Sequence, residues 1–249
     1  MSTIIERRGR VQIITLDRET KRNALNPEIA AGLEAGLNEL EDDPELWVGV
    51  LTGGTSCFSA GADLSTGGPG ETPRGGTAGL IHRRRTKPLI AAVEGFALGG
   101  GMELVLCCDL VVAATNASFG LPEVKRGLMP DFGGAFRSAR MLPANVAREL
   151  VLTGDSISAE RAERLGFVNV LTEPGGALTG AMELAGRIVT NAPIAIREAM
   201  ALVNDAVSGD EAPLWERSNA AHARLLQTED VREGVGAFLE KRSPVWRGR

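Results

Sequence analysis

Short apolar runs that alternate with helix signals constrain the fold of this chain more than any other feature. Val11–Leu16, Val48–Leu51, Leu89–Val93 and Leu110–Ala114 have the length and apolar character of buried strands. Helix-like stretches separate these runs, which indicates a largely parallel sheet in an α/β fold. In such a sheet, ligands bind where strands turn into helices.

Two helices are predicted between these strands. The first begins with Asn26 as its N-cap and Pro27 at the first helical position, and it ends at Asp42-Asp43-Pro44. The second covers Gly99–Cys108 and closes at Asp109. The first helix has apolar residues at helical spacing, namely Ile29, Leu33, Leu37 and Leu40.

Two regions differ in pattern from this core. Residues 65–79 are rich in Gly, Pro and Thr and have almost nothing to bury, which predicts a mobile loop. Beyond Asn191-Ala192-Pro193 the pattern is helical to about Leu239. We therefore expect residues 1–190 to form the core that holds the active site. Residues 191–249 are expected to form a helical region that packs on a neighbouring subunit.

Composition and charge argue against several classes of protein. Of the 249 residues, 43% are hydrophobic and 24% are charged, which is typical of a globular protein. The net charge of -5 argues against a dedicated nucleic-acid-binding protein, which is normally basic. No apolar run reaches the roughly 18 residues of a membrane span, and the N-terminus lacks the order of a signal peptide.

Two smaller features bear on location and ligands. Cys57, Cys107 and Cys108 have neither metal-binding nor CxxC spacing, so we interpret them as buried, reduced thiols of a cytoplasmic protein. The basic run His82–Lys87 is interpreted as a solvated face, with attraction of phosphate groups as the alternative.

A glycine run followed by two carboxylates carries the functional signal. Gly99-Gly100-Gly101-Met102-Glu103 places backbone N–H groups at a helix N-terminus beside one carboxylate, and Pro122-Glu123 supplies a second carboxylate. Donors for a developing oxyanion, together with two carboxyls that move protons, are what thioester-enolate chemistry requires. Glu103 follows Gly100 by about one helical turn, so both address the same helix face.

Each of these features also has a purely structural interpretation. An isolated glycine run is usually a tight turn with close packing. Glu103 alone would complement the helix dipole, and Glu123 alone would be a carboxylate at a helix start. It is their occurrence together that favours a catalytic site.

Five segments complete a pattern that spans nearly the whole chain. They are Lys21-Arg22-Asn23-Ala24-Leu25-Asn26, Phe58-Ser59-Ala60-Gly61-Ala62-Asp63-Leu64, Phe96-Ala97-Leu98-Gly99-Gly100-Gly101-Met102-Glu103, Phe119-Gly120-Leu121-Pro122-Glu123 and Phe238-Leu239-Glu240-Lys241-Arg242. With these segments in this order, the chain resembles the crotonase (enoyl-CoA hydratase/isomerase) family. Residues 116–131 and the Pro244-Val245-Trp246 tail are most similar to its carnitinyl-CoA dehydratase branch.

The resemblance implies a fold, an assembly and a reaction. The fold would be a crotonase-like spiral of ββα units with a helical C-terminal region, assembled as a homotrimer or homohexamer. The reaction would be reversible addition of water across the double bond of a 2-enoyl-CoA, with no metal and no cofactor besides the coenzyme A of the substrate. The N–H groups of Ala62 and Gly100 would form the oxyanion hole. Glu103 would activate water, and Glu123 would protonate the α-carbon.

The resemblance also implies contacts with coenzyme A. The adenine and pantetheine portions would lie along the backbone near four residues, Ala24, Ala60, Asp63 and Leu64. Phe238 and Lys241 would approach the nucleotide end. The same C-terminal residues also fit a plain amphipathic helix, which is compatible with this role.

Position 131 departs from the straight-chain hydratases, which carry glycine there. Asp131 is either a turn residue after Pro130 or a functional residue of an isomerase or dehydratase branch. Phe132 replaces a smaller residue, so we expect an unusual acyl pocket. Carnitinyl-CoA dehydration and double-bond isomerisation are therefore alternatives to hydration.

An RNA-binding relative of the hydratases is the alternative from another class of function. The acidic charge and the two intact glutamates argue against it. A salt-dependent RNA-binding assay would distinguish the two functions, because contacts with phosphates weaken steeply as salt rises.

Overall fold

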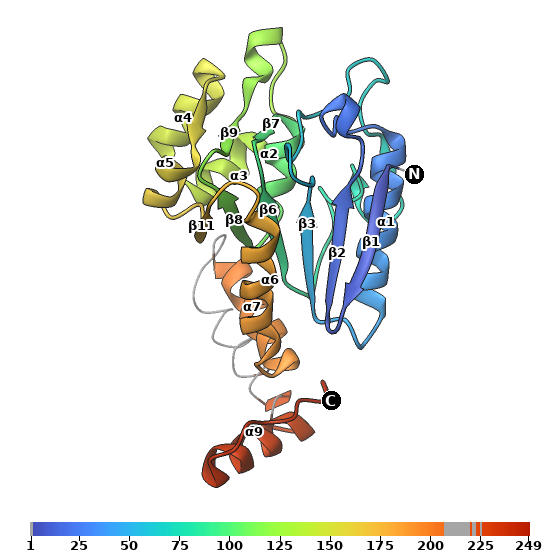
Figure 1. Ribbon diagram of the computed structural model, residues 1–249, viewed down its shortest axis with the longest axis vertical. Coiled ribbons are helices and arrows are strands. Elements are labelled where there is room, and N and C mark those ends of the chain that lie inside the picture. The colour runs from blue at the N-terminus through green and yellow to red at the C-terminus, as the bar shows by residue number, and fades with distance from the viewer. Residues whose placement is uncertain (1, 207–219, 221–222, 225) are drawn as a thin grey trace.

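Six strands form the main sheet, in the order β1-β2-β3-β6-β8-β11 (Figure 1). The computed structural model describes residues 2–206, 220, 223–224 and 226–249. β1 pairs with β2 antiparallel, and all later neighbours in the sheet are parallel, as predicted. The strands are β1 (Thr3–Arg8), β2 (Val11–Leu16), β3 (Val48–Thr52), β6 (Leu89–Val93), β8 (Leu110–Ala114) and β11 (Val170–Thr172).

A second sheet of three strands follows the carboxyl ends of β6 and β8. β7 (Phe96–Leu98) continues from β6, and β9 (Ser118–Gly120) continues from β8 and pairs parallel with β7. β10 (Ser156–Ser158) adds antiparallel to β9. A helical segment then follows each strand pair, namely α2 (Gly100–Val105) and the 3-10 helix η2 (Pro122–Arg126). These repeats form the predicted spiral of ββα units.

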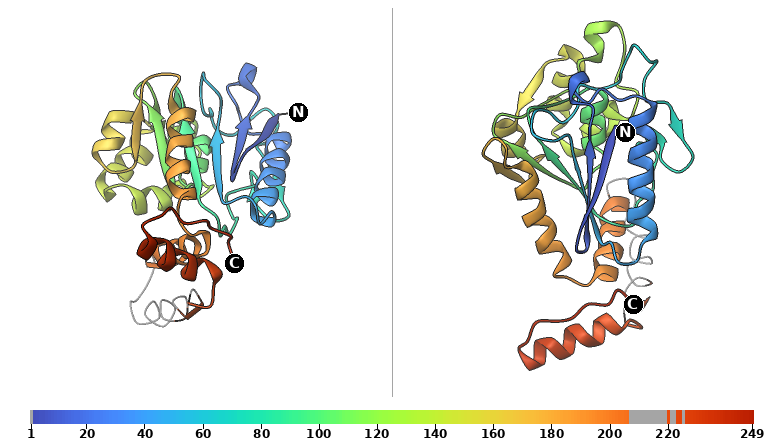
Figure 2. Two further views of the ribbon diagram at one scale, coloured as in Figure 1. Left: turned by 60° about the horizontal axis from the view of Figure 1, so that its bottom comes forward. Right: turned by 45° about the vertical axis from the view of Figure 1, so that its right-hand side comes forward.

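Helices cover both faces of the main sheet. α1 (Pro27–Asp42) packs on β1 and β2 at one face, and α6 (Ala177–Val189) packs on β3, β6 and β8 at the other (Figure 2). α3 (Gly134–Met141), α4 (Ala144–Thr153) and α5 (Ala159–Arg164) lie around the second sheet. Two apolar clusters result, one on each face of the main sheet.

The start and the buried face of α1 confirm the sequence prediction. The Asn26 side chain accepts a hydrogen bond from the Ile29 N–H at 3.0 Å, and Pro27 occupies the first helical position. This cap satisfies a backbone donor that the first turn leaves without a partner. All four predicted apolar positions are fully buried against the sheet, namely Ile29, Leu33, Leu37 and Leu40.

Two boundaries differ from the prediction. β1 was not predicted, because every residue after Thr3 is exposed and the strand lacks the alternation that marks a half-buried strand. α2 ends at Val105 rather than at Cys108, since Leu106 is its C-cap and a turn precedes β8.

The prediction of a mobile loop over residues 65–79 is wrong. β4 (Glu71–Thr72) and β5 (Gly76–Thr77) pair as a short antiparallel hairpin. The carboxylate of Glu34 on α1 accepts hydrogen bonds from the N–H groups of Arg74 at 2.6 Å and Gly75 at 2.9 Å. The buried carboxylate of Glu34 therefore holds this hairpin against α1. The composition of the segment itself could not reveal this contact, because Glu34 lies far from it in the sequence.

The basic run His82–Lys87 is only partly a solvated face, since His82 and Arg84 are exposed whereas Lys87 is buried. Arg83 donates to the Asn38 side chain, and Arg85 forms a partly buried ion pair with Asp109 at 2.7 Å. Lys87 is 1% exposed, and its ammonium donates to the carbonyl groups of Leu40 and Asp43, each at 2.6 Å. Arg83, Arg85 and Lys87 therefore bind groups of α1 and the start of β8. Attraction of phosphate by the exposed residues of the run stays a prediction.

The C-terminal region is helical where the structure describes it. α7 (Pro193–Ala206) follows α6, and α9 (Glu229–Glu240) lies outside the layers of the core (Figures 1 and 2). The final segment returns towards the core, where the Trp246 indole donates to the carbonyl of Thr190 at 2.6 Å. A role of residues 191–249 in oligomerisation stays a prediction.

Two further observations concern the described part of the chain. Cys57, Cys107 and Cys108 are free thiols, and Cys57 and Cys108 are buried. Among the described helices, none has the length and apolar character that crossing a membrane requires.

The buried Lys87 provides a test of this packing. Replacing Lys87 by Met leaves the carbonyl groups of Leu40 and Asp43 without their donor, so we expect the free energy of unfolding to fall by about 1–3 kcal/mol. Urea denaturation followed by circular dichroism measures this change. Lys21→Met, at an exposed position, is the control and should be nearly neutral. Equal stability of Lys87→Met and wild type would contradict the assigned role.

Candidate active site

A cleft of about 920 Å³ opens where the two sheets meet the starts of α2 and η2. Its walls come from residues 60–68, from the turn between β7 and α2, and from residues 122–132. The cleft brings together most residues that the sequence predicted for the site. These are Ala60, Ala62, Leu64, Gly100, Glu103, Glu123, Asp131 and Phe132.

Two backbone N–H groups converge at the base of this cleft. Leu25 and Ala62 form a parallel bridge in which Leu25 donates to the Gly61 carbonyl and accepts from the Asp63 N–H, so the Ala62 N–H is left outside the pairing. A Cβ placed on Gly100 would lie 3.3 Å from the Ala62 nitrogen. Among the described residues, neither the Ala62 nor the Gly100 N–H has a hydrogen-bond acceptor. Two such donors beside an open space have the arrangement of an oxyanion hole.

Glycine is required at this junction for steric reasons. Gly99 has φ +53° and ψ -128°, a conformation that L side chains rarely adopt, and its Cβ would lie 3.0 Å from Glu123 Oε1. Gly61 has φ +98°, and its Cβ would lie 2.8 Å from the Leu98 carbonyl oxygen. The glycines thus allow the two backbone segments to approach each other closely beside Glu123.

Glu103 is a buried acid held by a helix N-terminus. It lies in the first turn of α2, is 1% exposed, and accepts a hydrogen bond from the Gly134 N–H at the start of α3 at 2.8 Å. Burial raises the pKa of this carboxyl to about 7, with smaller contributions from the negative charges of Glu123 and Asp131. The Gly134 hydrogen bond favours the charged form and keeps the pKa from rising further. A carboxyl of this kind can take up or release a proton near neutral pH.

Glu123 faces the same space from the first turn of η2. It is half-buried, and among the described residues no group forms a hydrogen bond with its buried Oε2. Burial raises its pKa, and the charge of Asp131 adds to this effect. A buried carboxyl oxygen without a partner is available for a reacting group.

Asp131 and Phe132 complete the wall opposite the glycine run. Asp131 is exposed at the cleft, yet its charge acts on both Glu103 and Glu123. A Cβ on Gly100 would lie 3.4 Å from Cδ2 of Phe132, so this ring stands next to the paired N–H groups. Asp131 is therefore close enough to contribute to the chemistry or to acyl recognition.

Comparison with known proteins agrees with this geometry. The family described as enoyl-CoA hydratase/isomerase matches residues 6–249. The chain belongs to this family. A carnitinyl-CoA dehydratase from Salmonella typhi is 42% identical over 98% of this chain and 98% of its own length.

Solved structures show that the fold is shared. An enoyl-CoA hydratase from Mycobacterium tuberculosis H37Rv matches with a TM-score of 0.96 and 41% identity, over 100% of this chain and 99% of its own. A carnitinyl-CoA hydratase from Mycobacterium avium matches with a TM-score of 0.78 and 45% identity over the same shares. The predicted crotonase fold is confirmed, and the activity belongs to the class that acts on coenzyme A thioesters as hydro-lyases.

Of the family's predicted coenzyme A contacts, those near the glycine run lie at or beside the cleft. Ala60 and Leu64 line it, and Leu64 is 63% exposed. The carbonyl of Ala24 accepts a hydrogen bond from Arg18 at 2.9 Å. The Asp63 side chain is occupied by Ser65 and by Arg18 at 2.7 Å, and these partners lower its pKa to about 2. Asp63 therefore stabilises the loop with its side chain, and its backbone is engaged as well, since its N–H donates to the Leu25 carbonyl and its carbonyl accepts from the Gly68 N–H.

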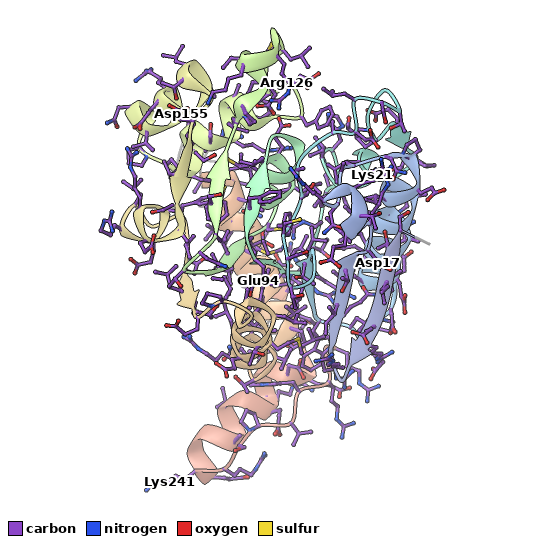
Figure 3. All side chains as sticks on the ribbon, turned by 45° about the horizontal axis from the view of Figure 1, so that its top comes forward. Asp17, Lys21, Glu94, Arg126, Asp155 and Lys241 are labelled. Carbon is purple, nitrogen blue, oxygen red and sulfur yellow. The ribbon has the colours of Figure 1, made fainter. Side chains whose placement is uncertain are left out.

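Of the two predicted contacts at the C-terminus, Lys241 is not brought to the cleft within one chain. Lys241 lies at the opposite end of the molecule from Arg126, a residue of the cleft wall (Figure 3). Phe238 belongs to α9, but its side chain is outside the described residues. Their contact with coenzyme A stays a prediction.

Sequence reasoning missed two cations at the cleft. Arg22 and Arg126 both line it, and the Arg22 carbonyl accepts a hydrogen bond from the Ala60 N–H at 2.9 Å. Arg22 lies within the Lys21–Asn26 motif, so its place in that motif could have indicated a position near the site. Arg126 is four residues after Pro122, and only the fold of η2 places it at the cleft wall.

The raised pKa of Glu103 predicts a penalty in stability that depends on pH. The unfolded carboxyl loses its proton near pH 4.3, whereas the folded carboxyl keeps it until about pH 7. The free energy of unfolding of the wild type is therefore not reduced by this carboxyl at low pH. It falls as the pH rises through this interval, because the folded state holds the proton more tightly than the unfolded state, and it stays reduced at higher pH. Glu103→Gln does not titrate, so we expect it to gain stability relative to wild type by on the order of 3 kcal/mol between pH 4 and pH 8.

Urea denaturation of both proteins across this pH range measures the difference. Glu39→Gln, at an exposed position on α1, controls for the loss of one negative charge. A constant stability difference between Glu103→Gln and wild type at all pH values would show that Glu103 ionises normally.

Proposed function

We propose that the protein is an enoyl-CoA hydratase that adds water reversibly to a 2-enoyl-CoA thioester. The observation that carries this proposal is the convergence of two backbone N–H groups, which have no acceptor among the described residues, with the buried Glu103 and the half-buried Glu123. As water attacks the β-carbon, negative charge moves onto the thioester oxygen. Two N–H groups at that oxygen stabilise the enolate, and loss of one such donor typically costs about 3 kcal/mol.

The two carboxyls divide the proton transfers between them. Glu103, as the carboxylate, takes a proton from the attacking water. Glu123, as the acid, delivers a proton to the α-carbon of the enolate. The raised pKa of about 7 keeps both proton states of Glu103 accessible near neutral pH, and the pKa of Glu123 is raised in the same direction by burial. Dehydration uses the same groups in reverse.

We extend this proposal to the cofactors, the oligomeric state and the location of the enzyme. The reaction needs no metal and no cofactor apart from the coenzyme A of the substrate. A homotrimer or homohexamer with the C-terminal helices at its interfaces is part of this proposal, and it rests on the similarity to the family alone. The free thiols of Cys57, Cys107 and Cys108 support a cytoplasmic location.

Dehydration of a carnitinyl-CoA is a second candidate, and Asp131 favours it. This third carboxylate at the cleft would attract a cationic acyl group such as one bearing trimethylammonium. The similarity to a protein named carnitinyl-CoA dehydratase supports the same substrate. If Asp131 acts as a base instead, double-bond isomerisation becomes the competing reaction.

Replacement of either glutamate tests the proposed pair. We expect Glu103→Gln and Glu123→Gln each to lower the hydration rate of crotonyl-CoA by at least about 100-fold, because each removes one positioned proton transfer. Loss of absorbance of the conjugated thioester follows the reaction, with Glu39→Gln as the unaffected control. A near wild-type rate in either variant would show that its residue is not catalytic.

Asp131→Asn separates the candidate reactions, since it keeps turn chemistry and removes the charge. If Asp131 is a turn residue, hydration of crotonyl-CoA should stay within about threefold of wild type. Selective loss of activity on crotonobetainyl-CoA would indicate charge pairing with a cationic acyl group, and selective loss of isomerisation would indicate a base. Assays of all three reactions on one purified variant decide between these roles. A collapse of crotonyl-CoA hydration with an intact fold would contradict the sufficiency of Glu103 and Glu123.

A further inference from the structure

The guanidinium of Arg137 joins three segments that meet around Glu103. Arg137 belongs to α3 and donates to the Ile81 carbonyl at 2.6 Å and to the Phe132 carbonyl at 3.1 Å. Its Nη1 also lies 3.2 Å from Sγ of Cys107, which in turn lies 3.2 Å from the Glu103 carbonyl oxygen. The planar guanidinium holds these partners in a fixed relative geometry. Arg137 itself is not part of the cleft wall.

The turn between Phe132 and Gly134 is packed between Arg137 and Glu103. A Cβ on Gly133 would lie 2.8 Å from Arg137 Nη1, and a Cβ on Gly134 would lie 2.8 Å from Glu103 Oε1. Gly133 has φ +95°, so glycine suits both its conformation and the available space. Arg137 donates a hydrogen bond to the Phe132 carbonyl at one end of this turn, and the Gly134 N–H at the other end donates to the Glu103 carboxylate at 2.8 Å.

We propose that Arg137 is a positioning residue that keeps the Phe132–Gly134 turn against Glu103 and so orients this carboxylate towards the attacking water. The inference rests on the proposed hydration reaction. Arg137 contacts neither the substrate nor the reacting atoms, and it acts only through the turn.

Arg140 is a matched control on the same helix. The guanidinium groups of Arg137 and Arg140 each lie 5.5 Å from the centre of the Phe136 ring. Arg140 is exposed, and among the described residues it has no hydrogen bond to the turn. Its replacement removes a similar charge and ring contact without releasing the Phe132 carbonyl.

The position of the turn also sets how Glu103 titrates. The charged and titratable groups around Glu103 are Glu123 from η2, Asp131 from the loop before α3, Cys107 from the turn after α2 and Arg137 from α3. Glu123 and Asp131 raise the pKa of Glu103, and the backbone N–H groups of the turn lower it. Release of the turn weakens the lowering contribution, so the pKa of Glu103 should rise.

Steady-state hydration of crotonyl-CoA between pH 5.5 and 9 tests this role. We expect Arg137→Met to lower kcat at pH 7 by about 10- to 100-fold, because a small misplacement of a reacting group has effects of this size. We expect KM to stay within about threefold, since the cleft wall is unchanged. The rising limb of the pH profile should move to higher pH. Arg137→Lys, which keeps one donor, should show a smaller loss, and Arg140→Met should behave like wild type.

Several results would overturn the inference. They are an unchanged kcat and pH profile in Arg137→Met, an equal loss in Arg140→Met, or a loss confined to KM. If Arg137→Met does not fold by circular dichroism, Arg137→Lys is judged by the same criteria. Absence of hydration in the wild type would overturn the proposed function and the inference together, whereas active wild type with unaffected Arg137 variants overturns the inference alone.

Discussion

The close approach of two backbone segments at Gly61 and Gly99–Gly100 is the constraint on which the rest of the site depends. A side chain at position 100 would fill the space beside the Ala62 N–H, and one at position 99 would meet the Glu123 carboxylate. Without side chains there, two N–H groups remain open to a ligand at the base of the cleft. The ββα spiral supplies this approach, because it brings the strand ends and the start of α2 to one place.

The same packing affects the pKa of the carboxyls in two opposite directions. Burial favours their neutral forms, and the negative charge of Asp131 adds to this preference for both, as that of Glu123 does for Glu103. Hydrogen bonds from the turn before α3 favour the charged form of Glu103 and oppose the effect of burial. A site that moves protons near neutral pH needs both influences, and it accepts a loss of folding stability for them.

The sequence predicted local features well and long-range contacts poorly. The α1 cap at Asn26, the strand Leu89–Val93 and the pairing of glycines with Glu103 depend on neighbouring residues, and the structure agrees with each. The inward direction of Lys87 and the anchoring of the β4–β5 hairpin by Glu34 depend on partners more than 35 residues away in the sequence. Arg137 was missed for the same reason, since its partners meet only in the folded chain.

The vibrational frequency of the bound thioester carbonyl tests the central claim most directly. An enoyl-CoA with an isotope-labelled carbonyl can be bound to Glu103→Gln, which keeps the paired N–H groups and slows turnover. If the Ala62 and Gly100 N–H groups both donate to the thioester oxygen, the carbonyl stretch should shift to clearly lower frequency than in water, because two preorganised donors polarise the bond. A frequency equal to that of the free thioester in water, at saturating protein, would contradict the account.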